Sequence, residues 1–156
     1  SDNADSDGGA SQRLLGSLLT WMAERKSRVF IVATANDIQA LPPELVRKGR
    51  LDEIFFVDLP DAATRADILR IHLARRKQDA SQFNLTPLAE SCNGFSGAEI
   101  EQAVVAALYE AVAEKQPLSD ALLIAEMQRT RPLSVVMSEK LQALRDWAAD
   151  RTVMAN

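Results

Sequence analysis

The chain has 156 residues, of which 47% are hydrophobic and 26% are charged, a profile typical of a globular protein with one domain, or a partial domain plus a small helical one. Its formal net charge of −4 argues against nucleic acid as the main partner, because neutralising phosphates requires a clustered basic surface. The single cysteine, Cys92, excludes an internal disulfide and a cysteine-based zinc site. No apolar run approaches the roughly 20 residues that span a bilayer, so we expect no membrane partner.

The first sixty residues combine helical and strand patterns. Residues 1–9 are acidic and small, and they predict a mobile loop. From Ser11 onward, apolar residues recur at helical spacing and predict an amphipathic helix. Residues 28–35 (RVFIVATA) predict a strand buried on both faces, and residues 54–58 (IFFVD) predict a second strand that Pro60 closes.

Every segment after Pro60 has a helical pattern, and none is a convincing strand. Gly94 is placed to end a short helix that begins at Thr86-Pro87. Ser96 and Glu99 form a capping box, in which each side chain satisfies a backbone donor of the other residue. The residues expected to cap helix N-termini are Asp61, Ser96, Ser119 and Ser138.

Asn36 follows the first predicted strand as a single amide side chain. The carboxyl edge of an open α/β sheet is where ligands bind, and an amide there could hold a water against a γ-phosphate. The alternative is a simple turn, because Asn and Asp both favour turns after strands.

Two arginines flank a glycine at the end of the next segment. Pro42 and Pro43 can start a short helix, which Gly49 ends. Arg47 and Arg50 could bind phosphate oxygens, and an arginine supplied in trans can raise phosphoryl-transfer rates by about 10³- to 10⁵-fold. The alternative is a solvated basic helix end that interacts favourably with the helix dipole.

The order of these features resembles AAA ATPases from about Asp7 to Glu101. That order is strand, Asn, proline-led helix, Arg-x-Gly-Arg, Leu-Asp, strand and Leu-Pro-Asp. The resemblance implies an α/β fold: the C-terminal part of a P-loop αβα core, with two strands of an incomplete sheet, followed by an all-helical lid. The domains would be residues 1–60 (partial core), 61–132 (lid) and 133–156 (C-terminal helix and tail). The sequence looks most like the hypothetical-chloroplast-reading-frame AAA ATPases of plastids, cyanobacteria and other bacteria.

The resemblance also implies roles for particular residues. It identifies Asn36 as sensor 1, and Arg47 and Arg50 as arginine fingers that act on the nucleotide of an adjacent subunit. In the lid, four residues match positions that contact adenine, ribose or the rest of the nucleotide: Ile68, His72, Gly97 and Ala98.

Two of the residues after Pro60 have simpler interpretations as well. A lone histidine on the apolar side of a helix is often a satisfied, half-buried residue, but Ile68 lies one turn before His72 on the same face. Cys92 is better interpreted as a small buried apolar residue than as a nucleophile, since no base partners it in sequence.

Two motifs of an active P-loop ATPase do not occur in this sequence. There is no Gly-x-x-x-x-Gly-Lys-[Ser/Thr] loop to bind phosphates, and no apolar strand ends in Asp-Glu. We therefore expect a C-terminal piece of a longer ATPase that is inactive alone. The parent polypeptide would use ATP and Mg²⁺ and form a homo-oligomeric ring, which we expect to be a hexamer. It would remodel a protein partner in the cytoplasm or plastid stroma.

The missing strands have a structural consequence. In AAA modules the strand before the phosphate loop separates the two strands predicted here, so both would expose unpaired edges. We expect the helical part to be the well-folded unit, and the first sixty residues to be rearranged or completed by strand exchange.

Two other functions are open from the sequence. The helical part could be a non-catalytic interaction or scaffold module, with the arginines as surface charge. A DNA-associated helicase or clamp-loader relative is disfavoured by the acidic balance and the lack of interleaved basic and aromatic residues.

Overall fold

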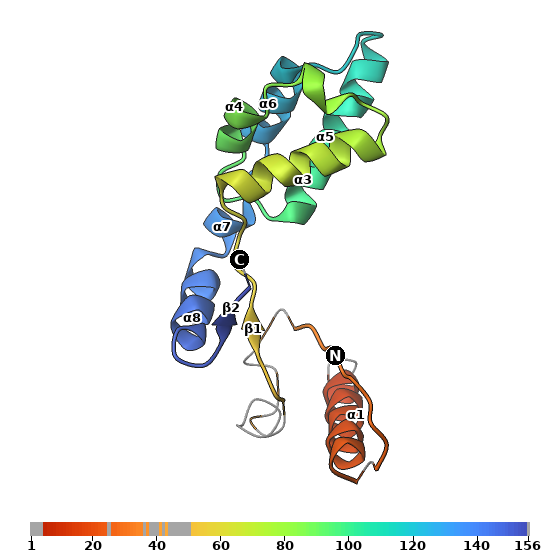
Figure 1. Ribbon diagram of the computed structural model, residues 1–156, viewed down its shortest axis with the longest axis vertical. Helices are drawn as coiled ribbons and strands as arrows, with labels where there is room; N and C mark the ends of the chain where they lie inside the picture. The colour runs from red at the N-terminus through yellow and green to blue at the C-terminus, as the bar shows by residue number, and fades with distance from the viewer. Residues whose placement is uncertain are drawn as a thin grey trace. The chain divides into compact units, whose positions relative to one another are not determined.

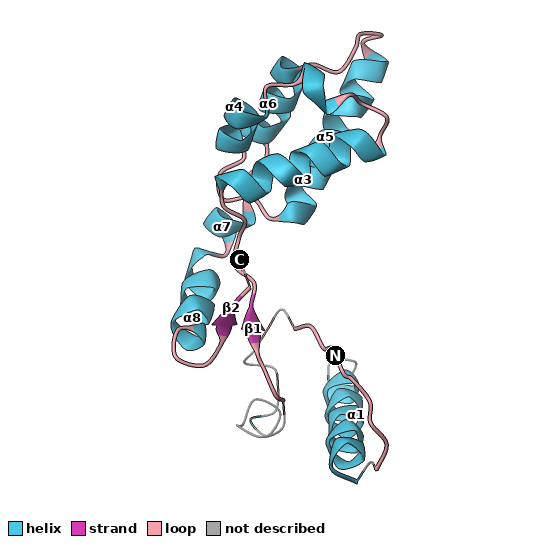
Figure 2. Ribbon diagram, viewed as in Figure 1, coloured by secondary structure: helices cyan, strands magenta, loops and turns pink. Residues whose placement is uncertain are grey.

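The computed structural model describes residues 5–24, 26–35, 37, 41, 43 and 51–155. The chain divides into two compact units, Ser1–Ile54 and Phe55–Asn156, which we describe separately. Figure 1 labels the helices and strands, and Figure 2 shows that helices dominate the second unit. None of the described helices combines the length and apolarity that a bilayer span requires.

The first unit contains helix α1, Asp5–Glu24. This confirms the predicted amphipathic helix, but the prediction of a loop over residues 1–9 is wrong from Asp5 onward. Extending an existing helix fixes one residue for each new hydrogen bond, whereas nucleation is costly, so a helix can propagate into a segment that would not start one. Part of its apolar stripe is exposed, including Leu14 (76%) and Trp21 (47%).

Residues 28–35 do not form the predicted strand. Phe30 and Val32 are 92% and 77% exposed, so the predicted burial on both faces is also wrong. A strand needs neighbouring strands to pair its N–H and C=O groups, and apolar residues alone do not provide them. Most of the proline-led helix lies outside the described residues, although Pro43 is helical.

The second unit is built mainly from helices, in agreement with the expected lid. They are α3 (Ala62–Arg75), α4 (Leu85–Ser91), α5 (Gly97–Ala113), α6 (Asp120–Arg129), α7 (Leu133–Val136) and α8 (Ser138–Ala148), with a 3-10 turn, η1 (Ala80–Gln82), before α4. Helix α3 packs against α4 and α5, and α6 packs against both α4 and α5. The fully buried larger side chains of this core are Leu69, Leu73, Leu88, Cys92, Ile100, Val104, Leu123 and Met127, where Met127 is 2% exposed.

Local side chains set the starts of α3, α5 and α6. The Asp61 carboxylate accepts a hydrogen bond from the Thr64 amide at 2.8 Å, and Ser119 caps α6 through the Leu122 amide. Both predicted caps are confirmed, as is the capping box at Ser96. The predicted cap at Ser138 is wrong, because α8 begins at Ser138 and the residue before it, Met137, makes no side-chain cap.

The helix that Gly94 was predicted to end stops earlier, at Ser91, and Gly94 closes the turn that follows, with a φ of +80° that side chains disfavour. A Cβ at this position would lie 2.3 Å from the Ser134 Oγ, so α7 packs closely on this turn. The Glu99 carboxylate also accepts a hydrogen bond from the Leu133 amide at 2.7 Å. Helix α7 is therefore held against the start of α5.

Arg65 on α3 is buried, with 7% of its surface exposed. Its Nε donates to the Ala89 carbonyl and its Nη1 donates to the Pro60 carbonyl, both at 2.8 Å. A buried guanidinium is tolerated when its donors are satisfied in this way. Arg65 thus links α3 to α4 and to Pro60, which lies between β1 and α3.

Strand β1, Phe55–Phe56, lies in the second predicted strand segment and pairs in parallel with β2, Val153–Met154. The Ala155 amide extends the ladder to the Phe56 carbonyl at 3.0 Å. Figure 1 shows these two strands side by side. The fold class is confirmed, but the partner strand comes from the C-terminal end of the chain, where no strand was predicted. Phe56 is consequently only 8% exposed.

A salt bridge joins the end of the β1 segment to α8. The Arg145 guanidinium donates from Nε and Nη2 to the two carboxylate oxygens of Asp58, each at 2.8 Å. This bidentate arrangement lowers the pKa of Asp58, mainly through the hydrogen bonds from Arg145. The C-terminal segment is therefore attached to the β1 segment in two ways: by the backbone of β2 and by the side chain of Arg145 on α8.

Candidate functional site

Two of the predicted nucleotide contacts meet where α5 begins beside α3. Ile68 lies on α3, and Gly97 is the first residue of α5. A Cβ on Gly97 would lie 3.7 Å from the Ile68 Cδ1, and no closer heavy atom surrounds it. Both residues are partly exposed, so the structure places an apolar side chain next to an accessible stretch of backbone.

The start of α5 is held rigidly by its capping box. The Ser96 amide and hydroxyl each donate to Glu99 Oε2 at 2.8 Å, and the Glu99 amide donates back to the Ser96 Oγ at 3.3 Å. The first amides of a helix have no acceptor within the helix. Gly97 and the exposed Ala98 carry two of these first amides.

His72 lies one turn after Ile68 on α3, with a side chain that is 12% exposed. Its Nδ1 is 3.3 Å from the Nη1 of Arg76 and 3.4 Å from the Oε1 of Glu101, which lies on α5. Arg76 also donates from Nη2 to Glu101 Oε1 at 2.8 Å and from Nη1 to the His72 carbonyl at 3.2 Å. The hydrogen bond from Arg76 is the main reason that the pKa of Glu101 is lowered.

Ala98 lines the same hollow as Arg76 and Glu101, the two residues that contact His72. A hollow on the outer face of α5 is lined by Arg76, Ala98, Glu101, Gln102, Val105, Ala106 and Tyr109. Of the four predicted nucleotide contacts, only Ala98 lines this hollow, while Ile68 faces Gly97 and His72 contacts Arg76 and Glu101. We call the region where α3 meets the start of α5, with these four residues, the seam.

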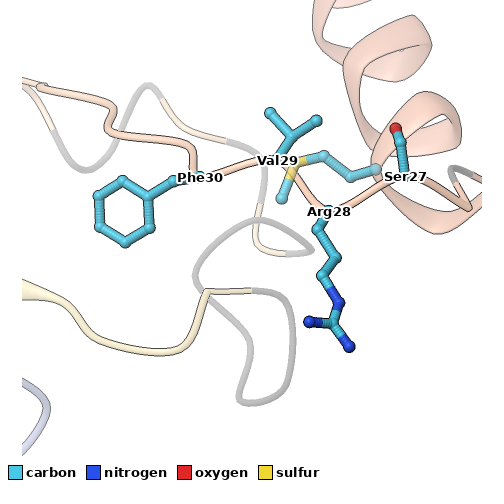
Figure 3. Close-up of a pocket in the computed structure, with 5 residues that line it drawn as sticks. Ser27, Arg28, Val29 and Phe30 are labelled. Carbon is cyan, nitrogen blue, oxygen red and sulfur yellow. The ribbon is translucent and has the colours of Figure 1, made fainter.

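A second hollow belongs to the first unit and contains none of the predicted site residues. It is lined by Met22, Ser27, Arg28, Val29 and Phe30 (Figure 3). The side chains of Arg28 and Phe30 point in different directions there. They do not converge on a common point, and we assign no function to this hollow.

Asn36, Arg47 and Arg50 lie outside the described residues. Their roles as sensor 1 and arginine fingers remain predictions. Cys92, in contrast, is fully buried, and burial raises the pKa of its thiol, which agrees with its interpretation as a structural residue.

Arg76 and Glu101 were not among the sequence candidates. The spacing of His72 and Arg76, four residues apart on one helix, was available as a signal of side-chain contact. Glu101 reaches the same group from α5, and nothing in the sequence indicates that contact between helices.

The donor set suits an organic group better than a metal. Among the described residues, no three His, Cys, Asp or Glu side chains gather in a way that could hold a metal ion. The part of the chain that the structure describes therefore does not fit Mg²⁺, and we derive no step through that ion. The seam does fit the nucleoside part of ATP, because it offers an apolar side chain, helix-start amides and a histidine.

Comparison with known proteins agrees with the sequence and the fold. Residues 1–59 match the ATPase family associated with various cellular activities (AAA), and residues 82–122 match the AAA+ lid domain. The chain belongs to the AAA family. Its helical second unit carries the lid match, and strand β1 lies within the residues that match the AAA model, whereas β2 lies outside both matches.

The chain is similar to plastid proteins of this family over most of its length. It is 41% identical over 149 residues to the "Uncharacterized AAA domain-containing protein ycf46" of Pyropia yezoensis, covering 95% of this chain and 30% of that protein. The proteins of the same name from Guillardia theta and Gracilaria tenuistipitata var. liui are 40% and 41% identical, over 94% of this chain in each case. The chain thus spans about 30% of the length of these relatives.

Proposed function

We propose that this chain is the sensor, arginine-finger and lid part of an ATPase that binds and hydrolyses ATP. The observation that carries the proposal is the seam between α3 and α5, in which Ile68 lies against the first residue of α5, Gly97, one turn from His72. Membership of the AAA family supports it.

In this proposal the seam binds the nucleoside. Ile68 covers one face of the base, and His72 hydrogen-bonds a polar atom of the base or ribose. The Gly97–Ala98 backbone can approach closely because Gly97 has no side chain and that of Ala98 is small. The phosphate loop and the Mg²⁺ ligands would come from the parent polypeptide.

The reacting phosphate would be handled by residues of the first unit. Asn36 would orient the attacking water, and Arg47 and Arg50 would stabilise the charge that develops on the γ-phosphate of an adjacent subunit. Because these arginines act in trans, the parent would form a ring, which we propose has six subunits. The ring would use ATP turnover to remodel a protein partner, in a bacterial cytoplasm or a plastid stroma.

The test uses a longer polypeptide that includes the phosphate-binding loop. Arg47→Ala or Arg50→Ala should leave ATP affinity nearly unchanged and lower turnover by about 10³-fold or more. Lys48→Ala, in the same basic run, is the matched control and should keep most turnover. Arginine variants that turn over ATP at the normal rate would remove the finger assignment.

A non-catalytic scaffold is the second candidate, and one observation favours it. Helices α3 to α6 bury an apolar core of their own, as a self-contained interaction module would. A scaffold would show no nucleotide binding in the longer polypeptide, and the binding measurement above separates the two functions.

A further inference from the structure

The contacts around His72 assign a position to its ring proton. A guanidinium group only donates hydrogen bonds, so Arg76 can bond the Nδ1 of His72 only if that nitrogen carries a lone pair. Glu101 would instead require a proton on Nδ1. The two neighbours therefore demand opposite tautomers of the neutral ring.

The geometry favours the contact from Arg76. Both contacts to Nδ1 are long, 3.3 Å from Arg76 Nη1 and 3.4 Å from Glu101 Oε1, but only the contact with Arg76 has hydrogen-bond geometry. That oxygen also already accepts a 2.8 Å charge-assisted bond from Arg76 Nη2. The hydrogen bond that Glu101 accepts within this group therefore comes from the arginine.

Arg76 is itself fixed at several points. It donates to Glu101 across the helix interface and to the His72 carbonyl one turn back on α3. Its side chain is 22% exposed, so these contacts are partly shielded from water. Glu101 thus holds Arg76, and Arg76 holds the ring of His72.

We propose that Arg76 is a positioning residue that keeps His72 in the Nε2–H tautomer and makes it a hydrogen-bond donor to the nucleotide. The proposal rests on the proposed function for the nature of the ligand. Among the described residues, no hydrogen-bond partner of Nε2 is present. The ligand must then offer an acceptor to Nε2, such as a ring nitrogen of the base or a ribose oxygen.

The first test reads the tautomer directly in the 156-residue chain. His72 is the only histidine, so long-range ¹H–¹⁵N correlation of the imidazole gives one spin system that needs no assignment. At a pH well above the ordinary imidazole pKa of about 6.5, Nδ1 should resonate as an unprotonated nitrogen and Nε2 as a protonated one. The reverse pattern would overturn the proposal without any variant.

Variants then test whether Arg76 is the cause. Arg76→Met keeps the aliphatic stem and removes the donor, which leaves Glu101 to draw the proton to Nδ1, so the population should move toward Nδ1–H. Arg75→Met, at the exposed neighbouring position, is the matched control and should leave both ring nitrogens unchanged. Arg76→Lys, which keeps a donor, should retain more Nε2–H than Arg76→Met. Unchanged shifts in Arg76→Met, or no difference between the Lys and Met variants, would count against the proposal.

Nucleotide affinity in the longer polypeptide separates this proposal from the proposed function. Arg76→Met and His72→Ala should each weaken ADP binding by about two- to tenfold, the effect of one net hydrogen bond. Arg76→Met should have no further effect in a His72→Ala background. If His72→Ala leaves affinity unchanged, the lid contact with nucleotide fails while the tautomer result stands. If His72→Ala weakens binding but Arg76→Met does not, the positioning role fails alone.

Discussion

The lid helices and residues 28–35 are both rich in apolar side chains, yet only the helices bury them. Leu69, Leu73 and Leu88 have no exposed surface, whereas Phe30 and Val32 are 92% and 77% exposed. A helix satisfies its own backbone, and neighbouring helices then cover its apolar face. A strand must find a partner for its backbone before its side chains can be buried. The difference therefore lies in where the backbone partners are, and not in hydrophobicity.

Strand β1 lies between these two cases. It has found one partner, β2, and of its two residues Phe56 is buried while Phe55 is 62% exposed.

The largest expected effect on stability is at the buried core of the lid helices. Leu69→Ala removes a fully buried side chain and should lower the free energy of unfolding of the lid by about 2 to 5 kcal/mol. Phe30→Ala removes a larger side chain that is exposed, so it should change stability by less than about 0.5 kcal/mol. Urea denaturation of both variants measures the difference. Similar losses in the two variants would show that residues 28–35 are packed in solution.

A smaller effect on stability is expected at Arg65, which joins α3 to Pro60 and to α4. Arg65→Met keeps most of the side chain but leaves the Ala89 and Pro60 carbonyls without their donor, which should cost about 1 to 3 kcal/mol. Arg70→Met, at an exposed position of the same helix, is the control and should cost less than about 0.5 kcal/mol. Thermal unfolding followed by circular dichroism gives both values, and equal melting temperatures would contradict the role of Arg65.

The smallest effect concerns the attachment of α8 to β1 and depends on pH. The pKa of Asp58 is lowered from its ordinary value of 3.8, chiefly by hydrogen bonds from Arg145. A lowered folded-state pKa means that the pair stabilises the fold above pH 3.8, and that this contribution is lost as the pH falls through the folded-state value. Arg145 is 41% exposed, so Arg145→Met should cost less than about 1 kcal/mol at pH 7.

Denaturation at pH 7 and at a pH well below 3.8 tests this prediction. The difference between wild type and Arg145→Met should shrink at the lower pH, with Arg131→Met as an exposed control. A difference of the same size at both values would mean that Arg145 stabilises the protein by packing rather than by charge.

Features that depend on neighbouring residues were predictable from the sequence. The caps at Asp61, Ser96 and Ser119 each involve residues close together in the chain. The cap at Ser138 failed because α7 runs almost directly into α8, so that residue lies inside the helix.

Features that depend on distant residues were not predictable. The pairing of Phe55 with Val153 joins segments from opposite ends of the second unit, and Val153 carries no pattern that marks a strand. The same distinction applies to the residues of the candidate site. Ile68, His72 and Gly97 were predicted from the family resemblance, whereas Arg76 and Glu101 come together only because α3 and α5 pack against each other.

Mixing two inactive forms of the longer polypeptide tests the central claim most directly. One form carries Arg47→Ala and Arg50→Ala, and the other has a disabled phosphate-binding loop but intact arginines. If the arginines act on a neighbour's nucleotide, mixed rings contain sites with an intact loop from one subunit and arginines from the next, and the mixture should hydrolyse ATP faster than either form alone. A mixture no more active than its components, with mixed assembly confirmed, would contradict the account.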